Sequence, residues 1–244
     1  MKNKVIIIGD SYAFGHGCSD RIHYYDQNTK KWIGNPDFFL DGPSQHCWAG
    51  LAKSDFPKFE FINLAKPGNS NDNMFKELSE TIDENVALVI FSGTFANRML
   101  IKSDVIDKNE ILPWIVGAYW LEMEINRPKS YISSKEAFIK HLYHDAMGEN
   151  YAILSILAAW ATSILYKSKF IWSFPLEETM LTNRNLTLAH MKNLQFPGIA
   201  RYPFVTTFGV DQYSVVAADG HINDYGHRLY YDQEIKPLLT TLLA

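Results

Sequence analysis

The chain has 244 residues, enough for one large α/β domain or two small ones, and no shift in composition separates two halves. Its 23 Lys and Arg residues against 27 Asp and Glu give a formal charge of -4, and no basic run gathers enough positive charge to bind a phosphate backbone. We therefore predict a single domain over residues 1–244 and exclude nucleic acid as an expected partner.

Apolar segments in the chain are too short for export or membrane insertion. Residues 5–8 are far shorter than the apolar region of a signal peptide. The longest apolar segment, 151–165, is interrupted by polar residues and falls short of the roughly 20 residues that span a bilayer. We expect a soluble protein without a signal peptide or membrane span, either cytoplasmic or associated with a virus particle. Its oligomeric state stays open.

Three apolar runs predict strands in the first part of the chain. Residues 4–9 are rich in β-branched side chains, which is typical of a strand buried on both faces. Residues 59–64 lead into a segment with Pro, Gly and Asn, and then into a polar helix from about Asp72. Residues 87–91 form the third run. In parallel sheets, ligands gather beyond the carboxyl ends of such strands.

The C-terminal part continues the alternation of helix and strand. Residues 151–165 have helical length after a predicted N-cap at 149–150, and they lead into a fourth strand at 170–174. Apolar residues of the tail, 224–243, recur at helical spacing and predict a closing helix with a bend at Pro237. This order favours a mainly parallel sheet covered on both faces, a three-layer α/β/α, flavodoxin-like fold.

Two stretches do not fit the alternation and are predicted to be insertions, at about 20–53 and 99–150. Long loops in compact domains are commonly lids or binding surfaces. Partial helix is expected in the second stretch, around 112–124 and 135–147. The aromatic residues concentrated there suit either hydrophobic core or a surface on which a carbohydrate or acyl chain stacks.

Residues suited to acyl transfer lie at opposite ends of the chain. An alcohol is a poor nucleophile near neutral pH, so a catalytic serine needs a base, a group that orients the base, and oxyanion donors. Ser11 follows the first predicted strand directly, and Asp219 precedes His221 by two residues. We predict Ser11 as nucleophile, His221 as general base and Asp219 as its orienting carboxylate. The alternative is that Asp219 serves the turn and a backbone carbonyl orients His221.

Four sequence blocks occur in the order found in one hydrolase family. The first is Gly-Asp-Ser at 9–11, and the others lie at 67–71, 92–97 and 219–227. Together they resemble the motif blocks of the SGNH/GDSL hydrolases, whereas each block alone is weak evidence. The resemblance covers the predicted strands and the final helix and leaves out the two insertions. It implies the three-layer fold and an ester hydrolase that forms an acyl-serine intermediate.

The resemblance also implies an oxyanion hole. Backbone N–H groups of Ser11 and Gly68 would be donors, and the third block would supply an asparagine side chain. This chain departs from that pattern, because Phe95 stands where the family has the asparagine. Asn97, two residues later, is the candidate third donor, with a structural role as the alternative. Asp10 is expected to bond loop backbone.

The expected function is hydrolysis, or acyl transfer, of a carboxylic oxygen ester. Candidate substrates include O-acetylated carbohydrates, short-chain esters, thioesters and lipids, because the insertions that would shape the pocket lie outside the resemblance. The alternative function is a catalytically inactive SGNH-fold binding or assembly protein, for example one associated with a virus particle.

No metal or cofactor is expected. His16, Cys18, His46 and Cys47 hold suitable donor atoms, but their spacing matches no zinc pattern. The glycines after the first strand do not follow Gly-x-Gly-x-x-Gly, which argues against a nucleotide cofactor. Two cysteines are too few for a disulfide framework, so reduced thiols are expected. His227, at the start of the last helix, is expected to pack or cap.

Overall fold

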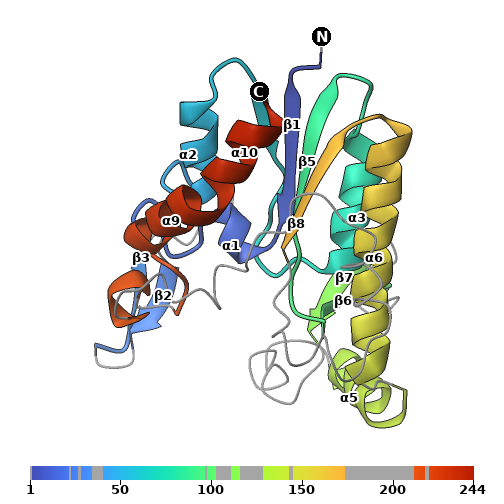
Figure 1. Ribbon diagram of the computed structural model, residues 1–244. Coiled ribbons are helices and arrows are strands. Elements are labelled where there is room, and N and C mark those ends of the chain that lie inside the picture. The colour runs from blue at the N-terminus through green and yellow to red at the C-terminus, as the bar shows by residue number, and fades with distance from the viewer. Residues whose placement is uncertain are drawn as a thin grey trace.

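The computed structural model (Figure 1) describes residues 2–21, 23–26, 29–34, 41–96, 98–102, 111–115, 129–142, 145–173, 212–217 and 220–244. Within these ranges, strands and helices follow one another along most of the chain. In chain order they are β1 (Lys4–Gly9), α1 (Ser11–Phe14), β2 (His23–Asp26), β3 (Lys31–Gly34), α2 (Trp48–Asp55), β4 (Glu60–Asn63), α3 (Asn71–Thr81), β5 (Val86–Ser92), β6 (Arg98–Lys102), β7 (Ile111–Ile115), α5 (Lys129–His141), α6 (Asp145–Leu165), β8 (Lys169–Ser173), η1 (Gln212–Val215), α9 (Asp224–Tyr230), η2 (Tyr231–Ile235) and α10 (Lys236–Leu242).

The central sheet has four parallel strands in the order β4-β1-β5-β8. β1 lies between β4 and β5, and its Val and Ile side chains are inaccessible to solvent on both faces. This explains why residues 4–9 read as a continuous apolar run rather than an alternating one. The four predicted strands are therefore confirmed to within a residue or so at each end, except that residue 174 lies outside the described ranges.

Helices cover both faces of the sheet (Figure 1). On one face, Val5 and Ile7 of β1 pack with Trp48 of α2 and with apolar residues of α9, η2 and α10. On the other face, Ile6 and Ile8 pack with apolar residues of α3 and α6. Alternate residues of β1 thus belong to two different hydrophobic cores, one on each face of the sheet. The predicted three-layer α/β/α architecture with a parallel sheet is confirmed.

Residues 111–115 and 145–150 differ from the sequence-based expectation. The helix predicted over 112–124 is wrong at its start, because β7 pairs antiparallel with β6 there, and residues 116–128 lie outside the described ranges. The N-cap predicted at 149–150 is also wrong, since α6 already begins at Asp145. Its polar first turns carry no apolar periodicity that would reveal them as helix.

The predicted C-terminal helix is present but not uniform. α9 passes into the π-helical segment η2, in which the Lys236 N–H bonds to Tyr231 O, and α10 follows. The π-helical segment ends two residues before Pro237, whose ring nitrogen cannot donate a helical hydrogen bond. Within the described part of the chain, no helix has the length and apolar character needed to cross a membrane.

Candidate active site

Ser11 begins α1 at the carboxyl end of the central strand β1. The side chain of Asp10 caps this single helical turn by accepting the Tyr12 N–H at 3.0 Å. Ser11 is the first residue of α1, so its N–H has no acceptor within the helix. No described residue outside the helix accepts it. Ser11 is 3% exposed. The capped turn therefore places Ser11 at the sheet edge where a parallel α/β fold binds ligands.

His221 comes to this edge on a tight turn from the other end of the chain. Val216 and Ile222 form an antiparallel bridge around the turn, and the Ala217 N–H bonds to His221 O at 2.7 Å. The side chain of Asn223 then caps α9 by accepting the Gly226 N–H. The imidazole is consequently held on a short segment whose two ends are both fixed.

The ring of His221 packs over the loop that follows Ser11. It stacks on the His16 ring with centroids 4.2 Å apart, and it lies 5.5 Å from the ring of Tyr12. A Cβ at Gly17 would lie 2.7 Å from the His221 Cβ, so only glycine permits this approach. The His221 ring, 210 positions along the chain from Ser11, thus contacts residues that closely follow Ser11. No hydrogen bond joins the Ser11 hydroxyl to the His221 ring within the described structure.

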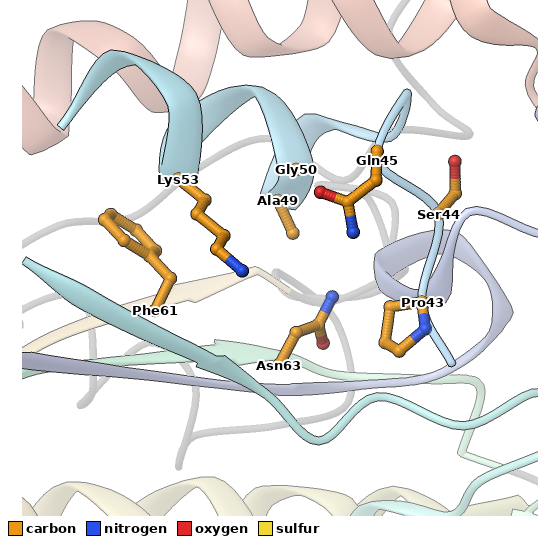
Figure 2. Close-up of a pocket in the computed structure, with 8 residues that line it drawn as sticks. All are labelled: Pro43, Ser44, Gln45, Ala49, Gly50, Lys53, Phe61 and Asn63. Atoms are coloured by element: carbon orange, nitrogen blue, oxygen red, sulfur yellow. The ribbon is translucent and has the colours of Figure 1, made fainter. Parts of the chain in front are cut away.

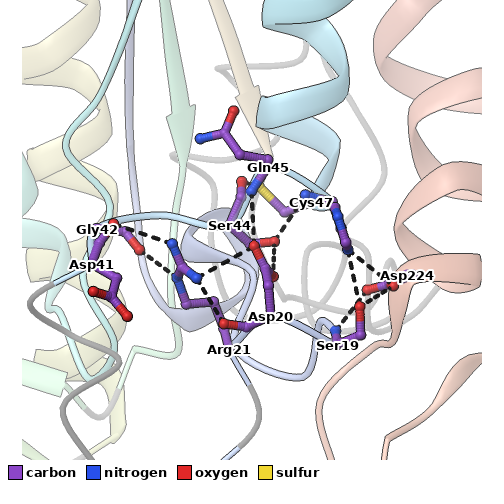
Figure 3. A network of polar contacts seen from close by, with 10 residues as sticks. Ser19, Asp20, Arg21, Asp41, Gly42, Ser44, Gln45, Cys47 and Asp224 are labelled. Atoms are coloured by element: carbon purple, nitrogen blue, oxygen red, sulfur yellow. Dashed lines mark hydrogen bonds and ion pairs between the residues drawn. The ribbon is translucent and has the colours of Figure 1, made fainter. Parts of the chain in front are cut away.

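A polar cluster ties the same two ends of the chain together (Figure 3). Asp224, three residues after His221, accepts the Ser19 N–H at 2.9 Å and the Ser19 hydroxyl at 2.6 Å. Its carboxylate also contacts His46 Nδ1 at 3.2 Å. Burial raises the pKa of Asp224, but the Ser19 hydrogen bonds and the contact with His46 together outweigh burial, so the pKa is lowered. His46 Nδ1 contacts both the Ser19 hydroxyl and the Asp224 carboxylate. A catalytic triad uses one ring nitrogen for the serine and the other for the carboxylate, so this cluster is not a second triad.

The second block places Gly68 in a conformation suited to an oxyanion donor. Its φ of 76° is accessible to glycine and costly for other residues. No described residue accepts the Gly68 N–H. The neighbouring Asn69 is buried and holds the loop, with its Nδ2 donating to Gly9 O at 3.3 Å and to Glu77 at 3.1 Å. The loop is therefore bonded directly to β1, the strand that precedes Ser11.

Buried hydrogen bonds also join the first three blocks. Asn71 and the backbone of Thr94 bond reciprocally, at 2.9 and 2.8 Å. The Thr94 hydroxyl donates to Asp10 at 2.7 Å, and Arg98 pairs with the same carboxylate at 3.1 Å. The expectation that Asp10 bonds loop backbone is confirmed, since it accepts the Tyr12 N–H. The sequence analysis missed Asn71, Thr94 and Arg98.

Two predicted site residues, Asn97 and Asp219, lie outside the described residues. Phe95, which stands where the asparagine was expected, packs with Tyr12 and Ile222 in a small apolar cluster. The guanidinium of Arg98 also lies 5.5 Å from the centroid of the Phe95 ring. The third block therefore contributes an apolar side chain beside residues that flank Ser11 and His221.

The remaining histidine and thiol candidates are buried. His227 is inaccessible to solvent, and its Nδ1 accepts the Trp48 N–H at 3.4 Å, which confirms a packing role. Burial lowers the pKa of His227 to about 3. Cys18 and Cys47 are free thiols, as expected, and burial raises the pKa of both, that of Cys47 to about 11. No group of three or more His, Cys, Asp or Glu residues in the described ranges is arranged to hold a metal ion.

Comparisons with known proteins bear on the fold. No family model and no curated protein sequence matches the chain. A solved structure of a carbohydrate esterase is similar, with a TM-score of 0.54 at 12% identity over 99% of this chain and 68% of that chain. The other similar structures include a lipolytic protein of the G-D-S-L family from Desulfitobacterium hafniense DCB-2 (TM-score 0.49, 12% identity, 98% of this chain and 99% of that chain) and the esterase EstA from Pseudoalteromonas sp. (TM-score 0.49, 11% identity, 99% and 98%). The similarity to the carbohydrate esterase structure, with its TM-score of 0.54, confirms the fold expected from the SGNH/GDSL resemblance.

Proposed function

We propose that the protein is a serine ester hydrolase of the SGNH/GDSL type, with residues 1–244 forming a single domain. The observation that carries this proposal is the packing of the His221 ring against His16 and Tyr12, on the loop and helix that begin at Ser11. On this proposal, a base and an alcohol from distant parts of the chain act together at the carboxyl end of β1. In such a fold, this edge of the sheet is where a reacting ligand is expected.

The proposed reaction runs through a covalent acyl-serine. His221 takes the Ser11 proton while the hydroxyl oxygen attacks the ester carbonyl, and the same proton passes to the leaving alcohol. Water, deprotonated by His221, then attacks the acyl carbonyl and releases the carboxylic acid and free Ser11. We expect the His221 ring and the Ser11 hydroxyl to come within hydrogen-bond distance on substrate binding, because catalytic hydrogen bonds are often long in ligand-free sites.

Oxyanion stabilisation rests on backbone donors. The N–H groups of Ser11 and Gly68 have no acceptor among the described residues, which leaves both available for the charge that develops on the carbonyl oxygen. Two further roles are proposed from the sequence alone. Asn97 is the third oxyanion donor, and Asp219 orients His221. No cofactor is needed for these steps.

An O-acetylated carbohydrate is the substrate class we propose. A similar solved structure is described as a carbohydrate esterase, and the partly buried Phe95 ring, packed on Tyr12 and Ile222, suits a short acyl group or a sugar face. Acetate release from acetylated glycans, compared with fatty acid release from lipids, tests this substrate class. Greater release from lipids contradicts it.

Ser11 is tested by covalent labelling. A fluorophosphonate probe is expected to modify Ser11 in the native protein, and peptide mapping identifies the residue. Ser11→Ala removes the labelling and lowers hydrolysis of p-nitrophenyl acetate by at least about 10³-fold. The control Ser54→Ala changes an exposed serine on α2 and keeps both signals. Equal hydrolysis by the wild type and Ser11→Ala rules Ser11 out as nucleophile.

A non-catalytic binding or assembly protein with this fold is the second candidate. It is favoured by Phe95 in the place of the third-block asparagine and by the absence of a hydrogen bond between the described Ser11 and His221 side chains. A folded protein that neither labels with fluorophosphonate nor hydrolyses activated esters supports this second candidate.

A further inference from the structure

A cavity of about 150 Å³ lies between α2, β4 and the segment that precedes α2 (Figure 2). Ala49, Gly50 and Lys53 of α2 form one wall, and Phe61 and Asn63 of β4 form another. The lining is completed by Pro43, Ser44 and Gln45. None of these eight residues belongs to the candidate active site.

Nitrogen donors converge on this cavity. Figure 2 shows the Lys53 ammonium and the Asn63 amide nitrogen directed into the same space, with the Gln45 amide at its rim. Among the described residues, Lys53 and the Gln45 side chain have no hydrogen-bond or ion-pair partner. Asn63 Nδ2 uses one N–H on Ala13 O at 3.0 Å, which leaves its second N–H available. The donors together suit an oxygen anion.

The charge around the cavity also favours an anion. Lys53 is the one charged side chain among the residues that line it. Asp20 accepts the Ser44 hydroxyl at 2.6 Å and the Gln45 N–H at 3.3 Å, and it contacts Arg21 at 3.4 Å. Asp55, on the helix of Lys53, is bound by Lys236 and Tyr231. Neither carboxylate pairs with Lys53.

Phe61, Pro43 and Ala49 form the apolar part of the lining. The ring of Phe61, the ring of Pro43 and the methyl group of Ala49 face the space between the two walls (Figure 2). Inorganic phosphate would leave this surface uncovered, whereas an organic acid with a short hydrocarbon chain would contact it. The cavity volume matches a ligand of a few non-hydrogen atoms.

We propose that this cavity is a binding site for a small aliphatic monocarboxylate, whose carboxylate contacts Lys53 and the amides of Gln45 and Asn63. The apolar chain of the ligand packs on Phe61, Pro43 and Ala49. The site goes beyond the proposed ester hydrolysis, because binding here involves neither Ser11 nor His221.

Sodium butyrate is the probe for a test by ¹H–¹⁵N NMR titration of the full chain. Butyrate is expected to shift the side-chain amide signals of Gln45 and Asn63 and the backbone signal of Gly50 in a saturable manner. Lys53→Gln removes the charge and keeps a polar side chain, and it weakens this binding at least about tenfold. The matched control Lys58→Gln changes an exposed lysine outside the cavity and leaves the affinity unchanged.

Several outcomes overturn the site. Butyrate shifts that do not saturate, or that remain equal in Lys53→Gln, contradict it. Phosphate binding as tight as butyrate contradicts the apolar half of the site, and Gln45→Ala that binds like the wild type contradicts the amide contact. Shifts confined to Tyr12 and His221 place the acid in the candidate active site instead. The butyrate titration involves neither an ester nor catalytic turnover. Its outcome therefore does not depend on whether Ser11 is labelled.

Discussion

Asp10 shows how one buried carboxylate organises the residues around the candidate nucleophile. It is inaccessible to solvent, and it accepts hydrogen bonds from the Tyr12 N–H, the Thr94 hydroxyl and Arg98. A buried charge is tolerated only when such partners replace its hydration. The Gly-Asp-Ser motif therefore has a structural reason for its acid, apart from any role in the chemistry of Ser11.

Arg98→Met is expected to lower the free energy of unfolding by about 3 kcal/mol, because it leaves Asp10 buried with an incomplete set of partners. Urea denaturation measures this loss. Lys76→Met is the matched control, since Lys76 pairs with Glu80 at 3.2 Å on the surface of α3 and such pairs contribute less than about 1 kcal/mol. A loss for Arg98→Met no larger than that of the control contradicts the role given to this ion pair.

At the scale of elements, α2 depends on an unusually close contact with the segment before it. A Cβ at Gly50 would lie 2.3 Å from the backbone oxygen of Gln45. This approach sets the wall of the proposed carboxylate cavity and brings Trp48 into the core beneath the helix. Helix propensity alone would favour alanine over glycine at this position.

Gly50→Ala is therefore expected to destabilise the protein, by about 1–3 kcal/mol, although the same change in an open helix would stabilise it by about 1 kcal/mol. The midpoint of urea denaturation reports the sign. Ser54→Ala, at an exposed position of the same helix, serves as the control and is expected to stay within about 0.5 kcal/mol of the wild type. A more stable Gly50→Ala variant shows that α2 does not need this contact.

At the scale of the whole molecule, the C-terminal segment closes one face of the sheet and carries His221 to the strand edge. α9 and α2 meet through His227, which is fully buried in its neutral form. The Asp224 cluster fixes the beginning of α9 to the loop after Ser11. The packing of the C-terminal segment on the sheet therefore also places His221 beside the loop after Ser11.

Stability is expected to fall with acid because of His227. Its pKa is lowered from 6.5 to about 3, so between these values the unfolded chain binds a proton that the folded chain does not. The contribution of neutral His227 is complete above pH 6.5 and is lost as the pH falls toward 3, at about 1.4 kcal/mol per pH unit.

His227→Asn keeps an acceptor for the Trp48 N–H and removes the titration, so it is expected to flatten the dependence of unfolding free energy on pH in this window. Urea denaturation across the window measures the slope. His141→Asn, at an exposed position of α5, is the control and keeps the wild-type slope. An unchanged slope in His227→Asn assigns the acid sensitivity to other groups.

The sequence by itself determined the secondary structure of the central strands and the short motifs that follow them. The apolar run of residues 4–9 and its neighbours specified buried parallel strands, because a strand covered on both faces has to be apolar at every position. Short motifs at strand ends likewise pointed to Ser11, Gly68 and His221. The sequence did not reveal β7 or the early start of α6, since neither carries a distinctive periodicity.

Only the tertiary structure decided which distant residues meet. The contact of His221 with His16, the pairing of Arg98 with Asp10 and the clustering of Ser19 with Asp224 join positions far apart in the chain. The cavity at Lys53 arises in the same way, between a helix, a strand and a loop. Sequence periodicity reports whether a side chain is buried, whereas the identity of its partner depends on how the layers pack.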